Sequence, residues 1–541
     1  MAFCNFKLIT VFYHMKNINI ILFLCNWGPH AAYQTLQDIK AEIPSSIRMV
    51  RIPCTGIISK ALLIKAFEMG ADGVVLAGCK SGACRYGSGT FTASENTEDI
   101  RNILEILGLG KERMRLETFY PDDSEEFLEF LKKFYMEIES LGATPVNYKK
   151  NMAAPSIDHK ALSDIASHHD VFACQDCGKC TSSCPLALSG KPFSPREVAG
   201  SILKGEVDSK ALVSDIWSCL TCGLCYDRCP AAVNFPEFIR DVRSFFKING
   251  FDVREAHGGF FQSVMRTMTC KELSGDHWDW LDDKISTDKK SKILFFGGCA
   301  PYFDIFFRKF LGTNSCNILS DSLRILNFFD IQPQILKDER CCGHDLLWSG
   351  DKENFIKLAN LNAESMNSLD IEEVITACPE CYRTLSHDYK EFGIDLNFKV
   401  THIYEFIDRE INKGAVSFKK LNKKITYQDS CRLSRFEGKA DLPRKLISYL
   451  NTNGFCETAD SGNAAICCGN SAWTGCDSYS KALQVKRLKQ VNDTGSDLLV
   501  TSCPKCQIHL TCAMENSFLD HNSGIKMSDL TSIIAKTIYW K

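Results

Sequence analysis

The first 145 residues alternate between short apolar runs and longer amphipathic stretches. The apolar runs predict strands at residues 20–24, 48–52, 73–77 and 117–120. The amphipathic stretches predict helices at residues 31–43, 61–69, 99–107 and 124–141. Strands that alternate with helices form parallel sheets, so this part of the chain is expected to be an α/β domain.

A second α/β pattern occupies the last half of the chain and occurs twice. Apolar strands are expected at residues 293–296 and 374–375, and again at 425–427 and 498–500. A Cys-Cys-Gly sequence at 341–343 recurs at 467–469, and a Cys-Pro-x-Cys sequence at 378–381 recurs at 503–506. Two duplicated α/β domains are the simplest explanation of this internal repeat.

Charge and hydropathy exclude several classes of protein. The net charge is -3 and 24% of residues are charged, so neither nucleic acid nor an anionic membrane is an expected partner. The longest apolar candidate, residues 18–27, is too short for a transmembrane segment and resembles a buried strand. No signal peptide is evident at the start, so we expect a cytoplasmic protein, and we take Met15 as the initiator.

Most of the 28 cysteines fall into four sets with metal-ligand spacing. Two consecutive runs read C-x2-C-x2-C-x3-C-P, the bacterial ferredoxin pattern for two 4Fe-4S clusters. Because the fourth cysteine of each run serves the other cluster, two ligand sets are expected: Cys174, Cys177, Cys180 and Cys229, and Cys219, Cys222, Cys225 and Cys184. Zinc is the alternative, since paired C-x2-C units also form Cys4 zinc sites. Such exposed clusters also suggest an anaerobe.

A third set lies in the N-terminal α/β domain, where Cys25, Cys54, Cys79 and Cys84 each follow a predicted strand. The carboxyl ends of parallel strands share one edge of the sheet, and ligands of open α/β sheets bind there. Cys79 and Cys84 have the C-x4-C spacing of plant-type ferredoxins, so a 2Fe-2S cluster is expected. A glycine loop that binds phosphate, or simple buried cysteines, are the competing interpretations.

The fourth set is duplicated, with five cysteines in each repeat. The first copy consists of Cys299, Cys341, Cys342, Cys378 and Cys381, and the second of Cys431, Cys467, Cys468, Cys503 and Cys506. Five thiolates exceed the four that a cubane 4Fe-4S cluster needs, so one thiolate is free to bridge irons or to act as a redox thiol. Zinc again remains an alternative, because spacing alone does not identify the metal.

These motifs resemble three components of one electron-transfer system. Residues 20–145, with Cys25-Asn26-Trp27 and the Ala77-Gly78-Cys79 to Cys84 loop, resemble the iron-sulfur D-type subunit of methyl-viologen-reducing hydrogenase. That family usually has a second cysteine where this chain has Gly28. The ferredoxin runs resemble the C-type subunit of heterodisulfide reductase, and the duplicated pattern resembles the CCG domain of its B-type and fused D-type subunits.

The resemblance implies a function for the duplicated cysteines. In that family they bind two non-cubane 4Fe-4S clusters that cleave the disulfide of coenzyme M and coenzyme B. The D-type branch also includes subunits linked to sulfite reduction and to lactate or glycolate oxidation, so the substrate stays open. His344, beside the first CCG, is a candidate proton donor to a leaving thiolate, although it also suits a hydrogen-bonding role in the ligand loop.

The resemblance also implies partners. No G-x-G-x-x-G fingerprint follows a strand, so no FAD is expected on this chain. A separate FAD-containing protein similar to the A-type subunit of heterodisulfide reductase is the expected partner, together with a hydrogenase or ferredoxin and a small disulfide substrate. The alternatives are an electron relay in a quinone-, sulfite-, lactate/glycolate- or acyl-linked complex, and a zinc scaffold without redox chemistry.

We therefore expect a multidomain α/β protein: an N-terminal parallel-sheet domain, a helical two-cluster ferredoxin domain and two duplicated CCG domains. The expected boundaries are residues 1–148 for the hydrogenase D-like iron-sulfur domain, 149–165 for a linker, 166–245 for the ferredoxin-type domain, 246–289 for a helical connector, and 290–400 and 401–541 for the CCG domains.

Overall fold

The computed structural model describes residues 18–146, 156–207, 210–251, 255–414, 416–515 and 525–540. The chain divides into two compact units, the first formed by residues 1–101 and 110–148 and the second by the rest. Met15, the predicted initiator, and residues 149–155 of the predicted linker lie outside the described residues.

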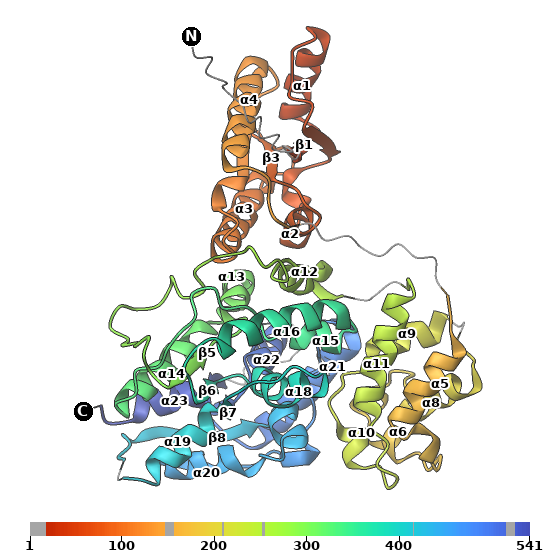
Figure 1. Ribbon diagram of the computed structural model, residues 1–541, viewed down its shortest axis with the longest axis vertical. Helices are drawn as coiled ribbons and strands as arrows, with labels where there is room; N and C mark the ends of the chain where they lie inside the picture. The colour runs from red at the N-terminus through yellow and green to blue at the C-terminus, as the bar shows by residue number, and fades with distance from the viewer. Residues whose placement is uncertain are drawn as a thin grey trace, which may run out of the picture. The chain divides into compact units, whose positions relative to one another are not determined.

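The first unit is built on a parallel sheet with the strand order β2-β1-β3-β4. Its two central strands, β1 and β3, are labelled in Figure 1. The strands of the sheet are β1 (Ile20–Cys25), β2 (Ile47–Ile52), β3 (Gly73–Cys79) and β4 (Met114–Phe119). All seven residues of β3 are buried, as expected for a central parallel strand covered on both faces. The predicted N-terminal α/β domain is thus confirmed.

Four helices accompany this sheet: α1 (Gly28–Asp38), α2 (Lys60–Glu68), α3 (Gly89–Ile106) and α4 (Ser124–Leu141). Helices α1 and α4 pack against each other over a core that contains Leu22 and Val75 of the sheet. Helix α3 begins ten residues earlier than predicted. Its first turns carry few apolar residues, but Ala93 and Thr97 are buried in register with Ile100 and Leu104, so one face of the whole helix packs inward.

The second unit starts with short helices that hold the ferredoxin-type motifs. They are α5 (His159–His168), α6 (Lys179–Ser183), α7 (Pro185–Leu188), α8 (Pro195–Lys204), α9 (Lys210–Ser218), α10 (Leu224–Asp227) and α11 (Phe235–Ile248). Gly178 and Gly223 adopt the left-handed conformation directly before α6 and α10. Each glycine turns the chain between the second and third cysteine of a run, a conformation that other residues adopt at a cost.

The duplicated region forms two parallel sheets. The first has the order β5-β6-β7 and the second β11-β10-β8-β9. The strands are β5 (Ile293–Phe296), β6 (Glu373–Thr376), β7 (Lys399–His402), β8 (Leu421–Gln428), β9 (Thr452–Phe455), β10 (Leu498–Thr501) and β11 (Lys526–Asp529). Strand β7 crosses residue 400, where the sequence predicted the boundary between the repeats. The duplicated α/β architecture is confirmed.

Helices surround both sheets. The first repeat has α13 (Ala300–Leu311), α14 (Cys316–Phe328), α15 (His344–Trp348), α16 (Lys352–Asn367), α17 (Pro379–Arg383), α18 (Tyr389–Glu391) and α19 (Ile403–Ile411). The second has α20 (Asp441–Tyr449), α21 (Ser478–Asp493), α22 (Pro504–Met514) and α23 (Leu530–Thr537). A π-helical turn occurs in each repeat, at Thr384–Asp388 and Arg432–Phe436.

The two repeats share one hydrophobic core. A single buried cluster joins Phe295 and Ile375 of the first sheet to Ile425 and Val500 of the second. Another buried cluster joins the ferredoxin-type helices to Cys467, Cys468, Cys503 and Cys506 of the second repeat. The motifs of the second unit are therefore held in place by common packing and are not separated by free linkers.

The predicted helical connector is helical over only part of its length. Helix α12 (Phe260–Thr267) follows a short 3-10 turn at Ala256–Gly259, and residues 268–292 contain no helix. The buried guanidinium of Arg340 explains this irregular path, because it donates to the carbonyls of Met268, Cys270, Lys271 and Leu273. The Arg340 side chain thus donates the hydrogen bonds that these carbonyls would receive from backbone amides in a helix.

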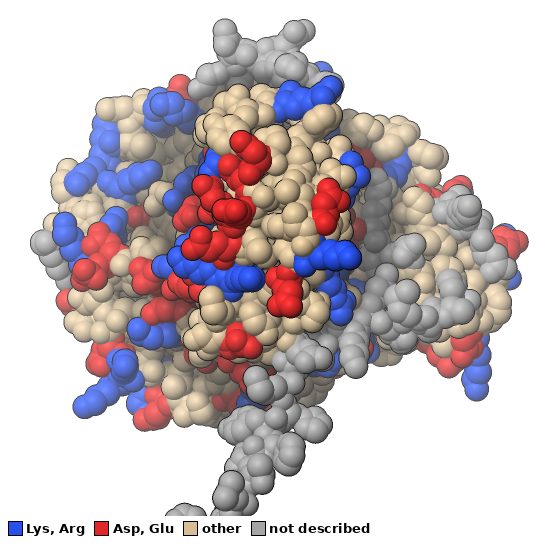
Figure 2. Space-filling view, turned by 90° about the horizontal axis from the view of Figure 1, so that it is seen from above, with Lys and Arg blue, Asp and Glu red and all other residues tan. Residues whose placement is uncertain are grey.

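Neither sign of charge dominates the face of the molecule that Figure 2 shows. On the face shown in Figure 2, acidic and basic side chains of the described residues are interspersed. Within the described ranges, none of the helices combines the length and apolar character that crossing a membrane requires.

Candidate metal centres

The four N-terminal cysteines lie at the carboxyl edge of the first sheet. Cys25 and Cys79 end β1 and β3, and their sulfurs are 3.6 Å apart. A side chain on Gly89 would place its Cβ 2.3 Å from Cys54 Sγ and 3.0 Å from Cys84 Sγ, so these two sulfurs flank the start of α3. The structure therefore brings together all four cysteines of the predicted 2Fe-2S set.

Backbone amides at the start of α3 also affect how easily the thiols of this set ionise. Burial opposes ionisation of Cys84, but the backbone amides of Tyr86, Thr90 and Gly89 outweigh it, and the pKa of the thiol is lowered. Burial and the neighbouring Cys84 and Cys79 raise the pKa of Cys54. Amides that favour a thiolate, and glycines that let the backbone approach it, suit a cluster ligand.

Gly28 stands where the resembled hydrogenase family usually has cysteine, and the structure gives the reason for the difference. A Cβ on Gly28 would lie 2.5 Å from the carbonyl oxygen of Phe119. Any side chain at this position would require the end of β4 to move. The set in this chain thus consists of four cysteines.

The eight ferredoxin-type cysteines separate into the two groups that the crossover rule predicts. Cys174, Cys177, Cys180 and Cys229 line one small cavity, and Cys184, Cys219, Cys222 and Cys225 line another. We call these the outer and the inner set. Cys174 and Cys177 are exposed, whereas Cys184, Cys219 and Cys222 of the inner set are buried.

The five cysteines of the first repeat form a continuous chain of thiol contacts. Hydrogen bonds join Cys299 to Cys341, Cys341 to Cys342, Cys342 to Cys381 and Cys381 to Cys378. Cys299 follows β5, Cys378 follows β6, and the Cys-Cys pair precedes α15. The ends of two parallel strands and one loop thus converge on one site.

The second repeat reproduces this arrangement. Its thiol contacts run from Cys431 to Cys467, Cys468, Cys506 and Cys503. Cys468 Sγ also lies 3.4 Å from His509 Nδ1. Because His509 corresponds to Thr384 of the first repeat, only the second set has a histidine at this position.

The spread of the sulfurs suits a larger group than a single ion. Four thiolates that bind zinc at about 2.3 Å lie about 3.8 Å from one another. Over the described residues, which include all 22 cysteines of these sets, no three of these sulfurs all lie within 4.8 Å of one another. The residues present therefore fit iron-sulfur clusters better than tetrahedral zinc.

A buried group of charged residues lies between the two five-cysteine sets. Lys505, inside the second C-P-x-C motif, forms ion pairs with Asp345 and with Glu380, whose Oε2 is 2.6 Å from Nζ. Burial opposes the charge of Lys505, but the carboxylates of Asp345 and Glu380 outweigh it and raise its pKa well above the ordinary value. Burial raises the pKa of Asp345 to about 7, although Lys505 opposes this shift.

His344 borders the same group. Its Nδ1 is 3.0 Å from Thr384 Oγ1, and its Nε2 is 3.6 Å from Glu380 Oε1. Burial and the positive charges of Arg432, Lys505 and Arg383 lower its pKa well below the ordinary value. His344 is therefore neutral near pH 7, and Lys505 carries the positive charge at this site.

Lys505, Glu380 and Asp345 were not among the site residues predicted from the sequence. One signal was available: the variable position of the C-P-x-C motif is glutamate in the first repeat and lysine in the second. Opposite charges at equivalent positions of a duplicated motif indicate that these positions face each other.

The inner ferredoxin set meets the second five-cysteine set directly. The thiols of Cys222 and Cys467 share a hydrogen bond, and Thr221 Oγ1 lies 2.7 Å from Ser471 Oγ. The contact joins ligand loops that are about 245 residues apart in sequence. It forms a continuous line of cysteines from the inner set to the second repeat.

Known families match three parts of the chain. Residues 20–142 match the family described as methyl-viologen-reducing hydrogenase, delta subunit. Residues 170–233 match the 4Fe-4S dicluster domain, and residues 293–386 and 425–511 match the cysteine-rich CCG domain. The matched regions contain every cysteine of the four sets, and the chain is an iron-sulfur protein.

Individual relatives agree with these matches. The D subunit of the dihydromethanophenazine:CoB–CoM heterodisulfide reductase of Methanosarcina barkeri is 27% identical over 71% of this chain and 98% of its own length. An iron-sulfur protein of Methanococcus maripaludis is 27% identical over 48% of this chain, which spans 49% of that relative.

The N-terminal domain has a separate relative. The iron-sulfur D subunit of the F420-non-reducing hydrogenase of Archaeoglobus profundus is 32% identical over 23% of this chain and 90% of its own length. The chain therefore belongs to the methyl-viologen-reducing hydrogenase delta subunit family through its N-terminal domain, and its 4Fe-4S and cysteine-rich domains are homologous to the D subunit of heterodisulfide reductase.

Proposed function

We propose that this chain is the iron-sulfur reductase subunit of a heterodisulfide reductase-like complex. Electrons from a hydrogenase or flavoprotein partner would pass through the N-terminal and ferredoxin-type sets to the two five-cysteine sets, where a disulfide is reduced. The observation that carries this proposal is the placement of Lys505, Asp345 and Glu380 between two equivalent five-cysteine sets. A buried charged group flanked by two such sets suits a reaction that needs two electrons and two protons.

The cofactors follow from the ligand sets. We assign a 2Fe-2S cluster to the N-terminal set, 4Fe-4S clusters to the outer and inner sets, and a non-cubane 4Fe-4S cluster to each five-cysteine set. When bound, these clusters would supply electrons one at a time. The chain would then contain roughly 18 irons.

The buried charges would serve the protons of the reaction. Two electrons and two protons convert one disulfide into two thiols. The Lys505 ammonium would stabilise the first thiolate released by its charge, and the neighbouring Asp345 would donate a proton to it. The pKa of Asp345, raised to about 7, suits a group that exchanges protons near neutral pH. His344 would orient Glu380 and Thr384 as a neutral imidazole, so we assign proton donation to Asp345 in place of the donor role predicted for His344.

Burial suggests the direction of electron flow within the second unit. The outer set has two exposed cysteines, and the inner set is buried against the second repeat. A partner could therefore approach the outer set closely, whereas the inner set is screened from solvent. We propose that electrons enter the second unit at the outer set.

A flavoprotein partner follows from what the sequence lacks. A donor that gives two electrons at once, such as a hydride carrier, must be converted into single electrons before the clusters can carry them, and a flavin performs that conversion. The sequence contains no dinucleotide-binding fingerprint. We propose a separate FAD-containing protein similar to the A-type subunit of heterodisulfide reductase.

Anaerobic assay of the chain with all clusters loaded tests this proposal. The CoB–CoM heterodisulfide is the first substrate to try, with a reduced low-potential dye as the donor. Cys341→Ser and Cys467→Ser, one ligand from each set, should each abolish turnover. Cys316→Ser is the matched control, because Cys316 is buried in the same unit but lies outside every set.

Two outcomes would count against the proposal. Turnover that persists in either ligand variant would show that the two sets do not act together. Absence of turnover in the loaded wild-type chain, with no substrate-dependent electron paramagnetic resonance (EPR) signal, would favour an electron relay without its own substrate site.

A further inference from the structure

Three arginines, two of them buried and one half-buried, surround the ligand loop of the inner ferredoxin set. They are Arg243 of α11 and Arg432 and Arg435 of the π-helical turn in the second repeat. We infer that this arginine collar holds the inner set at a higher reduction potential than the outer set and thereby directs electrons towards the second five-cysteine set. The inference rests on the proposed electron transfer but not on the identity of the substrate.

Each collar arginine is hydrogen-bonded to a different residue of the loop. Arg243 donates to the carbonyl of Cys219 at 2.6 Å, and Arg435 Nε donates to the carbonyl of Cys222 at 2.7 Å. Arg432 donates to the carbonyl and the hydroxyl of Thr221 at 2.9 and 3.0 Å. The loop between the first two inner cysteines is therefore held by three guanidinium groups.

The remaining donors of Arg243 and Arg435 also go to neutral acceptors. Arg243 donates to the carbonyls of Ile216 and Trp348, and Arg435 donates to those of Asn463 and Ala465. The Arg432 guanidinium carbon lies 3.9 Å from the centre of the Trp348 ring. Among the described residues, no carboxylate lies within 4.0 Å of a collar nitrogen.

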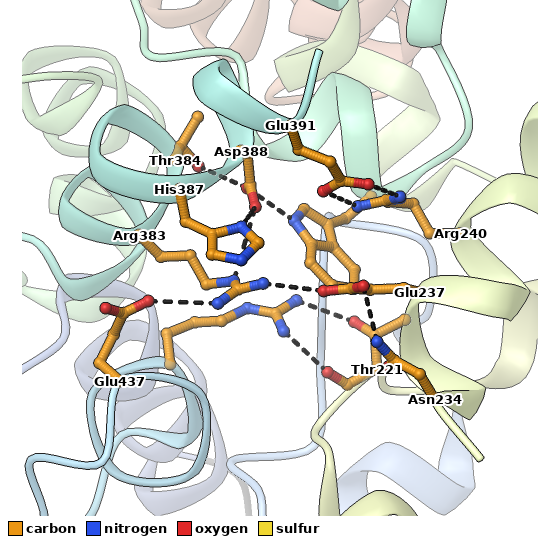
Figure 3. A network of polar contacts seen from close by, with 12 residues as sticks. Thr221, Asn234, Glu237, Arg240, Arg383, Thr384, His387, Asp388, Glu391 and Glu437 are labelled. Carbon is orange, nitrogen blue, oxygen red and sulfur yellow. Dashed lines mark hydrogen bonds and ion pairs between the residues drawn. The ribbon is translucent and has the colours of Figure 1, made fainter. Parts of the chain in front are cut away.

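Other arginines of the same interface do have carboxylate partners. Arg240, one turn from Arg243 on α11, pairs with Asp241 and Glu391. Arg383 pairs with Glu237 and Glu437, and Figure 3 shows these pairs together with the pair of Arg240 and Glu391. The protein thus pairs Arg240 and Arg383 directly with its own acids, whereas the collar arginines form no ion pair with a carboxylate of the described residues.

A buried charge needs a counter-charge, and the collar lies against ligand residues of the inner set. Arg243 and Arg435 donate to the carbonyls of Cys219 and Cys222, and Arg432 donates to Thr221 between them. The guanidinium groups therefore favour negative charge on the inner set.

This preference has a redox consequence. Each electron that reaches the inner set adds one negative charge there, and the outer set loses that electron and that charge. No atom is transferred in the step. The collar stabilises the reduced inner set by Coulomb attraction in a buried, weakly screened environment. The residues that the structure describes give the outer set no such collar: Arg196, which donates to the Asp176 carbonyl beside it, is paired with the Asp176 carboxylate.

Redox titration of the full, cluster-loaded chain by EPR tests the inference. Arg435→Gln and Arg243→Gln should each lower the potential of the inner cluster and leave the outer cluster unchanged. A tenfold loss in the equilibrium constant for reduction corresponds to 59 mV for one electron. A Cys177→Ser chain lacks one ligand of the outer cluster. The EPR signal that changes in this chain is therefore assigned to the outer cluster, and the other to the inner cluster.

Two further variants separate charge from structure. Arg240→Gln removes a buried arginine from the same helix, but one that already has two carboxylates, so the inner potential should stay unchanged. Arg435→Lys keeps the charge and should keep the potential and the iron, even where Arg435→Gln loses iron. An unchanged inner potential in both glutamine variants of the collar, or an equal shift in Arg240→Gln or Arg435→Lys, would overturn the inference.

These potentials are measured without a disulfide. A chain that fails to reduce any disulfide can still show the predicted shift, and a working reductase can lack it. Failure of the proposed function and failure of this inference are therefore distinguishable.

Discussion

Glu380 and Lys505 occupy the same position of the two C-P-x-C motifs and form a buried ion pair, with Oε2 and Nζ 2.6 Å apart. The two side chains lie at the starts of α17 and α22, the helices that carry the last cysteine of each set. A charge reversal at one position of a duplicated motif thus brings the two metal sets face to face. Buried charges tolerate few other arrangements, because an unpaired one is costly.

Replacement of Lys505 tests how much this ion pair contributes to the stability of the protein. Lys505→Met leaves Asp345 and Glu380 buried without their cation, and removal of one partner of a buried pair costs about 3–5 kcal/mol. We expect a lower melting temperature and loss of disulfide reduction. Thermal unfolding of the anaerobic protein, followed by circular dichroism, measures the first effect.

Lys271→Met is the matched control for this prediction. Lys271 joins the connector to α16 through Glu364, with Nζ and Oε1 3.1 Å apart, and both side chains are exposed. Exposed pairs contribute about 1 kcal/mol or less, so the control should unfold close to the wild type. Equal melting temperatures for Lys505→Met and the wild type would disprove the role given to the buried pair.

Local patterns made much of the fold predictable. The strand at Val74–Ala77 is continuously apolar because both faces of a central parallel strand are buried, and this signal is visible without a structure. The first ten residues of α3 carry mostly polar side chains, and only Ala93 and Thr97 face inward. Periodicity cannot identify a helix whose buried face is so sparse.

The cysteine sets were predictable because ligand spacing is a local property of the chain. The residues that act around them depend on contacts between distant segments. Lys505 meets Asp345 across 160 residues, and Arg432 meets Thr221 across 211 residues. Each of these side chains alone resembles an ordinary surface charge, and only the packing of the repeats reveals its role.

The N-terminal set provides a steric test. Gly89→Ala would place a methyl group 2.3 Å from Cys54 Sγ and 3.0 Å from Cys84 Sγ. Because the backbone of α3 is fixed by its packing, we expect the sulfurs to move and the chain to lose roughly two irons, those of a 2Fe-2S cluster. Iron analysis with visible and EPR spectroscopy measures the loss.

Gly200→Ala is the control, since nothing lies within 4 Å of the added methyl group in α8. It should retain all iron. Full iron content in Gly89→Ala, together with an unchanged 2Fe-2S signal, would contradict the placement of the cluster at this edge of the sheet.

Replacement of Arg383 tests which contacts attach the ferredoxin-type segment to the duplicated repeats. The Arg383 guanidinium pairs with Glu237 of α11 at 2.8 Å, with Glu437 at 3.2 Å and with the buried Asp388 at 3.5 Å (Figure 3). Arg383→Met leaves three carboxylates without their cation and should destabilise the second unit by about 3–5 kcal/mol. Limited proteolysis should then cut between α11 and β5 faster than in the wild type. Equal cleavage rates would contradict this expectation.

The buried carboxylate of Asp529 should make the stability of the protein depend on pH. Asp529 caps α23, where its carboxylate accepts from the Thr531 amide at 2.8 Å, and it is buried. Burial raises its pKa to about 7, although the amide and hydroxyl of Thr531 oppose the shift. In the unfolded chain the pKa is about 3.9. Between these values the folded state binds a proton that the unfolded state lacks, so stability falls as pH rises to about 7.

Asp529→Asn should remove this loss while keeping the cap, because asparagine is an equally good N-cap residue. The free energy of unfolding of the variant should exceed that of the wild type by an amount that grows by roughly 1.4 kcal/mol per pH unit between about pH 4 and pH 7. Above about pH 7 the difference should stay constant. Melting temperatures from pH 5 to pH 8 measure the difference. Asp158→Asn makes the same substitution at the N-cap of α5, where the side chain is exposed. It therefore shows the effect of replacing Asp by Asn at a cap without burial. A gain in Asp529→Asn that is the same at pH 5 and pH 8 would show that burial of the carboxylate is not its cause.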